Sequence, residues 1–246
     1  MSSKIIPLQF YKEPLPGIDT SELRGKLIVI EGPDSIGRST QVAQLRLWLE
    51  HQGHAVVDTG MARSALTRKG IQAAKTGHTL GPMTMALFYT TDFADRLENE
   101  IIPALRAGFV VLTDRYIFSM MARSIARGLD RRWMEGVAGI ALVPHAVFYL
   151  RAPVEDLVAR VVIGRGSFDY WESGMDVPFG KDRYESFVQY QGRIIRALDS
   201  MVETYNFTIV DASKSPEQIF KQLQKAIGRL LHIGKRRADA LNLAIA

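Results

Sequence analysis

The chain has 246 residues, of which 47% are hydrophobic and 23% charged, which is enough apolar material for one large domain with a substantial core. It contains no cysteine, so disulfides and thiolate metal sites are excluded, and its net charge of +5 suits an anionic small substrate or nucleic acid equally well. No apolar run reaches the roughly 20 residues of a membrane-spanning helix and the first residues lack a secretory pattern, so we expect a cytoplasmic protein without a membrane partner.

Residues 1–23 are expected to form an N-terminal arm ahead of the main domain, which we place at residues 24–233. Three prolines and a glycine in this stretch disfavour a helix and favour an extended segment. Such an arm packs on the surface of its own domain or on a partner subunit.

A loop between the first predicted strand and helix carries the most informative motif. Residues 27–40 read LIVIEGPDSIGRST, an apolar run suited to a buried strand followed by a glycine-bounded loop, and a helix is predicted over 39–52. The spacing matches G-x-x-x-x-G-K-[ST], except that Arg38 stands at the lysine position. In such a loop, backbone N–H groups and the helix N-terminus bind phosphate, and Ser39 would contact a magnesium ion. The alternative is an ordinary glycine turn before a helix.

The arginine at the lysine position leaves one question open. Lysine is a compact point charge, whereas arginine is a wide planar fork. Arg38 is able to bind phosphate, but the sequence does not decide whether it fits the loop well enough for fast phosphoryl transfer.

The second strand is predicted over 54–59, and a basic amphipathic helix over 63–76. Basic residues on such a helix usually form a solvated face. Arg63, however, follows the carboxyl end of a predicted strand, where ligands bind in open α/β sheets. It is therefore also a candidate phosphate clamp.

The remaining elements alternate between helix and strand. Helices are predicted over 82–106 (bent by a proline at 103), 116–127, 131–140, 154–163, 182–205 and 216–233, and strands over 109–114, 146–150 and 208–210. This alternation indicates an α/β domain with a parallel sheet. Right-handed crossovers then bring all strand tips to one edge.

An acid and an arginine follow the third predicted strand. Asp114 is placed to hold a magnesium ion directly or through water and to accept a proton. Arg115 supplies a planar fork for a second phosphate. Taken alone, the pair would equally be a helix cap with a surface ion pair. Beside a phosphate loop, the functional interpretation is favoured.

Together these pieces resemble the thymidylate kinase family. The resemblance rests on EGPD leading into GRSTQ at 31–41, LF at 87–88, IPALRAG at 102–108, DRY at 114–116 with a serine at 119, and VDAS at 210–213. It implies a P-loop NTPase fold with a five-stranded parallel sheet flanked by helices and a lid segment. It also implies ATP-dependent phosphoryl transfer to dTMP with Mg²⁺, in a protein that is usually a homodimer packed through helices.

The resemblance also implies roles for individual residues. The ATP phosphates would bind to Gly32, Pro33, Asp34, Ser35, Ile36, Gly37, Arg38, Ser39 and Thr40, with Ala212 and Ser213 beside the adenine. Ser39 and Asp114 would serve the metal. For the acceptor nucleotide, Asp34 would lie near the sugar hydroxyl, Phe88 would stack on the base, Ser119 would line the base pocket and Arg115 would bind the phosphate. An apolar residue such as Phe88 on a mixed helix is equally a core residue.

The chain departs from the family pattern around the acceptor site. The motif Arg-Glu-Pro-Gly-Gly after the second strand is missing, and residues 60–64 read GMARS instead. The arginine expected one turn beyond Phe88 is replaced by Asp92. Arg96 either substitutes for it or pairs with Glu100 at the i, i+4 spacing. These changes leave the selectivity for thymine open.

A glycine-punctuated loop at about 164–182 is the expected lid. A lid excludes water and brings cations to the transferring phosphate. Arg165 is the candidate catalytic arginine, with Lys181 and Arg183 behind it, and Arg160 is the candidate to flank the adenine. The alternative is that these are ordinary exposed basic residues. The aromatic and acidic run at 168–172 suits either substrate packing or a dimer contact.

Residues 234–246 are expected to be a basic C-terminal tail, either a frayed helix or a subunit contact. A nucleic-acid partner is disfavoured because no aromatic residues alternate with the basic ones. The sequence thus predicts a nucleoside monophosphate kinase that uses ATP, with dTMP as the favoured acceptor, and catalysis by Arg38, Asp114, Arg115 and Arg165. The alternatives are a non-catalytic nucleotide-binding homologue and a kinase of the same fold with a different acceptor.

Overall fold

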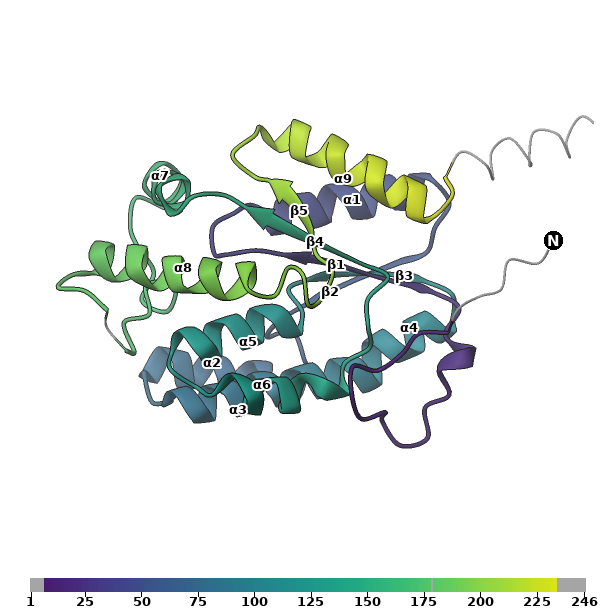
Figure 1. The fold of residues 1–246 in the computed structure, drawn as a ribbon, viewed down its shortest axis with the longest axis horizontal. Coiled ribbons are helices and arrows are strands. Elements are labelled where there is room, and N and C mark those ends of the chain that lie inside the picture. Colours follow the sequence, from purple (N-terminus) through teal and green to yellow (C-terminus); the bar gives the residue numbers. More distant parts are fainter. Residues whose placement is uncertain (1–6, 178, 234–246) are drawn as a thin grey trace, which may run out of the picture.

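The computed structural model describes residues 7–177 and 179–233, which form an open sheet covered by helices on both faces (Figure 1). Five strands pair in the order β2-β3-β1-β4-β5, and every pairing is parallel. The strands are β1 (Lys26–Glu31), β2 (Val56–Gly60), β3 (Val110–Asp114), β4 (Ala146–Arg151) and β5 (Thr208–Asp211). The prediction of a five-stranded parallel sheet is confirmed. The first and last residues of each strand lie within two residues of their predicted positions.

The sheet separates two hydrophobic cores. On β1, Leu27 and Val29 point into one core and Ile28 and Ile30 into the other, and all four side chains are fully buried. This explains why the strand is a continuous apolar run without polar alternation. The helices α1 (Arg38–His51) and α9 (Pro216–Leu230) cover one face (Figure 1).

The other face is covered by a larger group of helices. Figure 1 shows α3 (Pro82–Arg96), α5 (Ile117–Ala126), α6 (Arg131–Val137) and α8 (Arg183–Asp199) below the sheet. The remaining helical segments are α2 (Arg68–Gly77), α4 (Ile102–Arg106), α7 (Val154–Arg165), η1 (Thr20–Glu22), η2 (Leu97–Ile101) and η3 (Ala138–Ile140). None of the helices in the described part of the chain has the length and apolar character needed to cross a membrane.

Helix α2 begins five residues later than predicted, because a buried carboxylate holds the preceding segment in turns. Asp92 on α3 accepts hydrogen bonds from the backbone N–H groups of Ala62 and Ser64, both at 2.9 Å, and from the Thr67 hydroxyl at 3.2 Å. Side-chain acceptors of this kind compete with helical hydrogen bonding. The predicted helix start at residue 63 was therefore wrong.

The long helix predicted over 82–106 is confirmed in extent but is not a uniform α-helix. Between α3 and α4, the segment η2 is π-helical. Pro103 at the start of α4 has no N–H to donate, and irregular hydrogen bonding just before a proline is a common consequence.

The described part of the N-terminal arm lies against its own domain. Phe10 forms an isolated antiparallel bridge with Leu142, and the Tyr11 N–H donates to the Ala141 carbonyl at 2.9 Å. Leu8 is buried. The expected C-terminal tail at 234–246 lies outside the described residues.

Candidate functional site

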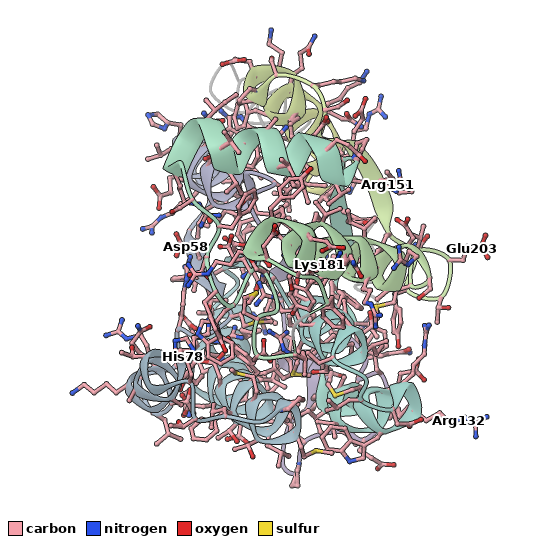
Figure 2. The ribbon with its side chains drawn as sticks, turned by 90° about the vertical axis from the view of Figure 1, so that its left-hand side faces the viewer. Asp58, His78, Arg132, Arg151, Lys181 and Glu203 are labelled. Carbon is pink, nitrogen blue, oxygen red and sulfur yellow. The ribbon has the colours of Figure 1, made fainter. Side chains whose placement is uncertain are left out.

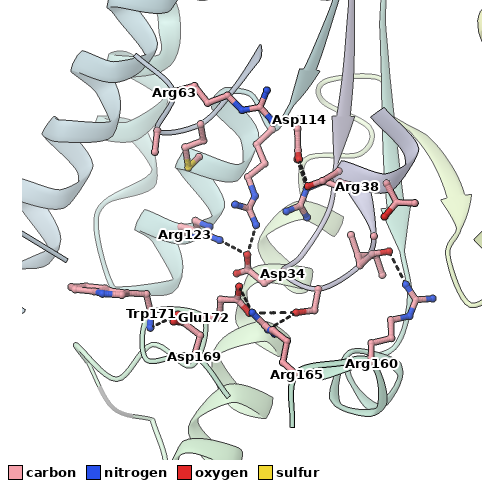
Figure 3. A pocket seen from close by; sticks show the side chains of 18 of the residues that line it. Asp34, Arg38, Arg63, Asp114, Arg123, Arg160, Arg165, Asp169, Trp171 and Glu172 are labelled. Atoms are coloured by element: carbon pink, nitrogen blue, oxygen red, sulfur yellow. Dashed lines mark hydrogen bonds and ion pairs between the residues drawn. The ribbon is translucent and has the colours of Figure 1, made fainter. Parts of the chain in front are cut away.

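A cavity of about 690 Å³ opens at the carboxyl edge of the sheet, where β1, β2 and β3 end (Figure 3). Ligand sites in open α/β sheets lie at this edge. Seven cationic side chains and four carboxylates contribute to its wall, so the cavity is suited to an anionic ligand. The charged residues are Arg38, Arg63, Lys75, Arg115, Arg123, Arg160, Arg165, Asp34, Asp114, Asp169 and Glu172.

The loop after β1 forms one wall of this cavity. Gly32 and Gly37 have φ angles of 154° and 95°, and a Cβ on Gly32 would lie 2.7 Å from the Leu150 carbonyl oxygen. Glycine is therefore required for the path of the loop. No side chain caps the N-terminus of α1, so its first N–H groups are available to an anion.

Arg38, Ser39 and Asp114 meet at the base of the loop, as the sequence predicts. The Arg38 Nε donates to one carboxylate oxygen of Asp114 at 2.8 Å, and the Ser39 hydroxyl donates to the other at 2.7 Å. A further Arg38 nitrogen donates to the carbonyls of Gly32, at 2.6 Å, and Pro33. Arg38 is only 6% exposed. The arginine thus braces the loop against the tip of β3.

The charge of Asp114 is maintained despite burial. Burial alone would raise the pKa of this carboxyl, but Arg38, Arg115 and the hydrogen bond from Ser39 outweigh it, and the pKa lies below its ordinary value. Asp114 is therefore ionised at neutral pH.

The donor set fits a magnesium ion that also binds substrate phosphates. Among the described residues there is no cluster of three or more His, Cys, Asp or Glu side chains able to hold a metal. Mg²⁺ in phosphoryl-transfer sites commonly has only one or two carboxylate ligands and takes the rest from phosphate and water. An ionised Asp114 beside the Ser39 hydroxyl meets this requirement.

A second cluster joins Asp34 to two arginines (Figure 3). One Asp34 oxygen accepts from both Arg115 and Arg123. The other accepts from the Gln191 side-chain amide at 3.0 Å. Burial raises the pKa of Asp34, but the two arginines and Arg38 outweigh burial and hold it below its ordinary value.

Arg115 has a strained backbone. Its φ angle is 72°, which is uncommon for a residue with a side chain, and such strain gathers at functional sites. Burial and the neighbouring cations lower the pKa of Arg115 to about 10, so that it stays charged at neutral pH.

Arg123 is a cavity residue that the sequence analysis missed. It lies one turn beyond Ser119 on α5, but Ser119 itself bonds to Glu31 and does not line the cavity, so this spacing gave no signal. Gln191 on α8 donates a hydrogen bond to Asp34 although the two residues are 157 positions apart in sequence. No local pattern predicts this contact.

Ser119 does not line the cavity. Its hydroxyl donates to the buried Glu31 carboxylate at 2.5 Å, and the backbone N–H groups of Tyr116 and Ser119 donate to the same carboxylate at 2.8 and 3.2 Å. Burial raises the pKa of Glu31. Ser119 thus fixes the start of α5 behind the cavity wall, and its expected place in a base pocket is corrected.

On α3, Tyr89 lines the cavity and its neighbour Phe88 does not. Phe88 packs instead against α2, where its ring lies 3.2 Å from the position of a Cβ built on Gly70. The Lys75 Nζ lies 6.0 Å from the Tyr89 ring centre and 5.9 Å from the Trp171 ring centre. Tyr89, Trp171 and Lys75 form an aromatic and cationic corner of the cavity, which we call the aromatic corner.

Arg96 lies outside the cavity as well. Its Nε donates to Asp92 at 3.0 Å, one turn back on α3, and the residue is 3% exposed. Glu100, the alternative partner, accepts from Thr59 at 2.5 Å. Arg96 therefore neither substitutes for a cavity arginine nor forms the expected pair with Glu100.

Arg63 does reach the cavity wall. It is an exposed side chain that pairs with Asp58 at 3.1 Å. A surface ion pair of this kind is weak, so Arg63 is available to an incoming phosphate.

Of the three residues expected near the adenine, Arg160, Ala212 and Ser213, only Arg160 lines the cavity. Arg160 lines the cavity and donates to the carbonyls of Ile36, at 2.7 Å, and Ala212. Ala212 is buried and Ser213 bonds to Asp211. Neither residue lines the cavity, although the contact with Arg160 ties this turn to the phosphate loop.

The candidate lid lies over the loop. Arg165 is the last residue of α7, and its guanidinium donates to the Ser35 hydroxyl at 2.9 Å and to Glu172 at 2.5 and 3.1 Å. Lys181 is exposed outside the cavity, and Figure 2 shows it on the outer side of the molecule near the start of α8. Arg183 is likewise exposed. Of the basic lid residues proposed, Arg165 alone lines the cavity.

Comparison with known proteins gives one consistent result. The family model described as thymidylate kinase matches residues 30–223. A protein named "Probable thymidylate kinase 2" from Saccharolobus solfataricus is 31% identical over 85% of this chain and 98% of its own length. "Thymidylate kinase" from Clavibacter michiganensis subsp. michiganensis is 32% identical, covering 86% and 99%. A third relative, "Thymidylate kinase" from Clavibacter sepedonicus, is 43% identical over 61% of this chain and 74% of its own length.

Proposed function

The chain belongs to the thymidylate kinase family of nucleoside monophosphate kinases, and we propose that it transfers the terminal phosphoryl group of ATP to dTMP. One observation carries this proposal. A single cavity is lined by the phosphate loop and also by Arg63, Arg115 and the aromatic corner. The phosphate loop is suited to the triphosphate of the donor, and the arginines with the aromatic corner are suited to a monophosphate that carries a planar base.

On the donor side, the loop would cradle the ATP phosphates through its backbone N–H groups. Ser39 and Asp114 would hold Mg²⁺, which when bound neutralises phosphate charge. Arg38 would keep the loop and Asp114 in register through the hydrogen bonds described above. Arg165 is held over the loop by Ser35 and Glu172 and would supply a cation to the transferring group.

On the acceptor side, we assign the base to the aromatic corner. Tyr89 and Trp171 provide faces on which a planar base stacks. The Trp171 indole N–H donates to the Lys75 backbone carbonyl at 3.1 Å, so the lid and α2 are joined where the base would lie. Arg115 and Arg63 would face the acceptor phosphate, and Arg115 is the more buried of the two and is held in place by Asp34.

Catalysis of this transfer needs little covalent chemistry from the protein. Positioning the acceptor phosphate oxygen in line with the terminal phosphate of ATP, and neutralising the charge that spreads over the phosphate oxygens, accounts for most of the acceleration. We further propose that the protein works as a homodimer in the cytoplasm.

The test is an assay of ADP release coupled to NADH oxidation, with dTMP, dUMP, dCMP, dGMP and dAMP as acceptors and Mg²⁺ present. We expect turnover with dTMP at a higher kcat/KM than with the other four nucleotides. Tight ATP binding without turnover on any acceptor would instead indicate a non-catalytic homologue. Turnover with another nucleotide but not with dTMP would contradict the assignment of the acceptor.

A further inference from the structure

Arg123 occupies a position for which the proposed function has assigned no role. It projects from α5 toward Asp34 (Figure 3), and Arg115 donates to the same Asp34 oxygen. The side chains of Arg123 and Arg115 are 11% and 19% exposed, and that of Asp34 is 3% exposed. All three line the cavity.

The cluster carries more positive than negative charge. Two guanidinium groups share one carboxylate, and one Asp34 oxygen takes a hydrogen bond from each. Burial of an unbalanced charge is costly unless a counter-ion is supplied. An anion entering the cavity would supply it.

The hydrogen-bonding capacity of the cluster is also incompletely used. The Nε of Arg115 is buried without a hydrogen-bond partner among the described residues. Buried donors of this kind are rare and are commonly satisfied by a ligand or water. Asp34 accepts hydrogen bonds from Arg115, Arg123 and Gln191, and none of these bonds uses the Nε of Arg115.

The other arginines near the acceptor side are committed elsewhere or exposed. Arg96 is fixed by Asp92, and Arg63 sits at the surface with Asp58. Arg127, one turn beyond Arg123, is neutralised by Asp176 at 2.7 Å and does not line the cavity. Apart from Arg38, which is held by Asp114 and the loop carbonyls, Arg115 and Arg123 are the part-buried arginines of the described residues that share one carboxylate at the cavity wall.

We propose that Arg123 is a substrate-binding residue that, together with Arg115, binds the 5′-phosphate of the acceptor nucleotide, while Asp34 positions both guanidiniums. The proposal rests on the kinase function given above. The position of Arg123 favours the acceptor over ATP, since it shares one Asp34 oxygen with Arg115, the arginine assigned above to the acceptor phosphate. Two planar forks converging on one phosphate give several charge-assisted hydrogen bonds.

The test compares a ligand that has the phosphate with one that lacks it. Calorimetric dissociation constants for dTMP and thymidine are measured for the wild-type protein, Arg123→Gln and Arg123→Lys. We expect Arg123→Gln to weaken dTMP binding by about ten- to a hundredfold, the range of a lost charged hydrogen bond, and thymidine binding by less than about twofold. Arg123→Lys should retain part of the preference for dTMP.

Arg127→Gln is the matched control, because it removes a buried, carboxylate-paired arginine from the same end of α5. It should leave the ratio of the two dissociation constants unchanged. Thermal unfolding of each variant identifies any that fails to fold, in which case Arg123→Lys, which keeps the charge, still reports on the ratio.

The outcomes separate this inference from the proposed function. Equal weakening of dTMP and thymidine, or an unchanged ratio in Arg123→Gln, would overturn the role of Arg123 while leaving the kinase intact. A wild-type protein that binds dTMP no better than thymidine and does not phosphorylate it would overturn the proposed function itself.

Discussion

At the scale of single residues, the site depends on an arginine where the motif has lysine. A guanidinium can donate in several directions within one plane, and Arg38 uses this to reach Asp114 and two loop carbonyls at once. A lysine ammonium lacks that planar reach. The substitution thus provides a structural brace in addition to a positive charge.

Removing this brace should affect both rate and pH dependence. We expect Arg38→Ala to lower kcat by at least about a hundredfold, as loss of a preorganised cation does. The pKa of Asp114 is held down partly by Arg38, so its loss lets burial raise that pKa. The acidic limb of the rate profile should therefore move to higher pH. Rates measured from pH 5 to 9 check this.

The matched control is Arg46→Ala on the same helix. Arg46 is exposed and pairs with Glu50 and Asp58 outside the cavity. The Arg46→Ala variant should have the same kcat and the same pH dependence of the rate as the wild-type protein. A normal rate in Arg38→Ala would show that the loop does not need a cation at this position.

Asp114 allows a second test at the same scale. Asp114→Asn keeps the shape of the side chain but removes the charge that Ser39 and Arg38 hold in place. We expect transfer to fall at least about a hundredfold, with a weaker dependence of rate on Mg²⁺ and an unaltered circular dichroism spectrum. Asp199→Asn, which removes a carboxylate paired with Arg151, is the control. A near-normal rate in Asp114→Asn would reject the assigned role.

At the scale of elements, features set by local sequence were predictable, and features set by contacts between distant residues were not. The strands and the meeting of the loop with Asp114 were predictable, because a buried apolar run and the shared edge of parallel strands are properties of local sequence and topology. The roles of Arg96 and Ser119 were not. Ser119 is fixed by Glu31, a buried carboxylate from another element, and one-dimensional patterns do not register such a pair. Arg96 pairs with Asp92 at the i, i+4 spacing within α3, but the sequence does not show that Asp92 is buried and also holds the backbone of the turn before α2.

The turn before α2 gives the clearest example and a stability prediction. Asp92 is fully buried, receives two backbone N–H groups and pairs with the buried Arg96. Asp92→Ala would leave that arginine charged and unpaired, and we expect a loss of about 3–5 kcal/mol in the free energy of unfolding. Urea unfolding at pH 7 measures it.

The neighbouring exposed carboxylate serves as the control for this prediction. Glu98→Ala on η2 should change stability by no more than about 0.5 kcal/mol. A loss below about 1 kcal/mol in Asp92→Ala would mean that the turn at 61–67 is not anchored by this carboxylate.

At the scale of the whole molecule, the cavity is enclosed by parts that meet only in the folded chain. The phosphate loop and β3 form its floor, and α2, α3 and α5 form one side. The lid contributes Arg165, Trp171 and Glu172 from above. The His78 ring at the end of α2 contacts Tyr170 and Trp171 of the lid. Residues 164–182 are thus joined both to α2, through these rings, and to the phosphate loop, through the bond from Arg165 to Ser35.

The outer surface of α3 bears on the proposed homodimer. Met83 and Leu87 lie one turn apart on this helix and are 50% and 47% exposed, so they form an apolar strip that a second copy would cover. We expect Leu87→Glu to convert a dimer into a monomer in sedimentation velocity. Leu47→Glu, at a 58% exposed leucine on α1 across the sheet, should leave the dimer intact. A wild-type protein that sediments as a monomer at micromolar concentration, or a Leu87→Glu variant that stays dimeric, would exclude this face as the subunit contact.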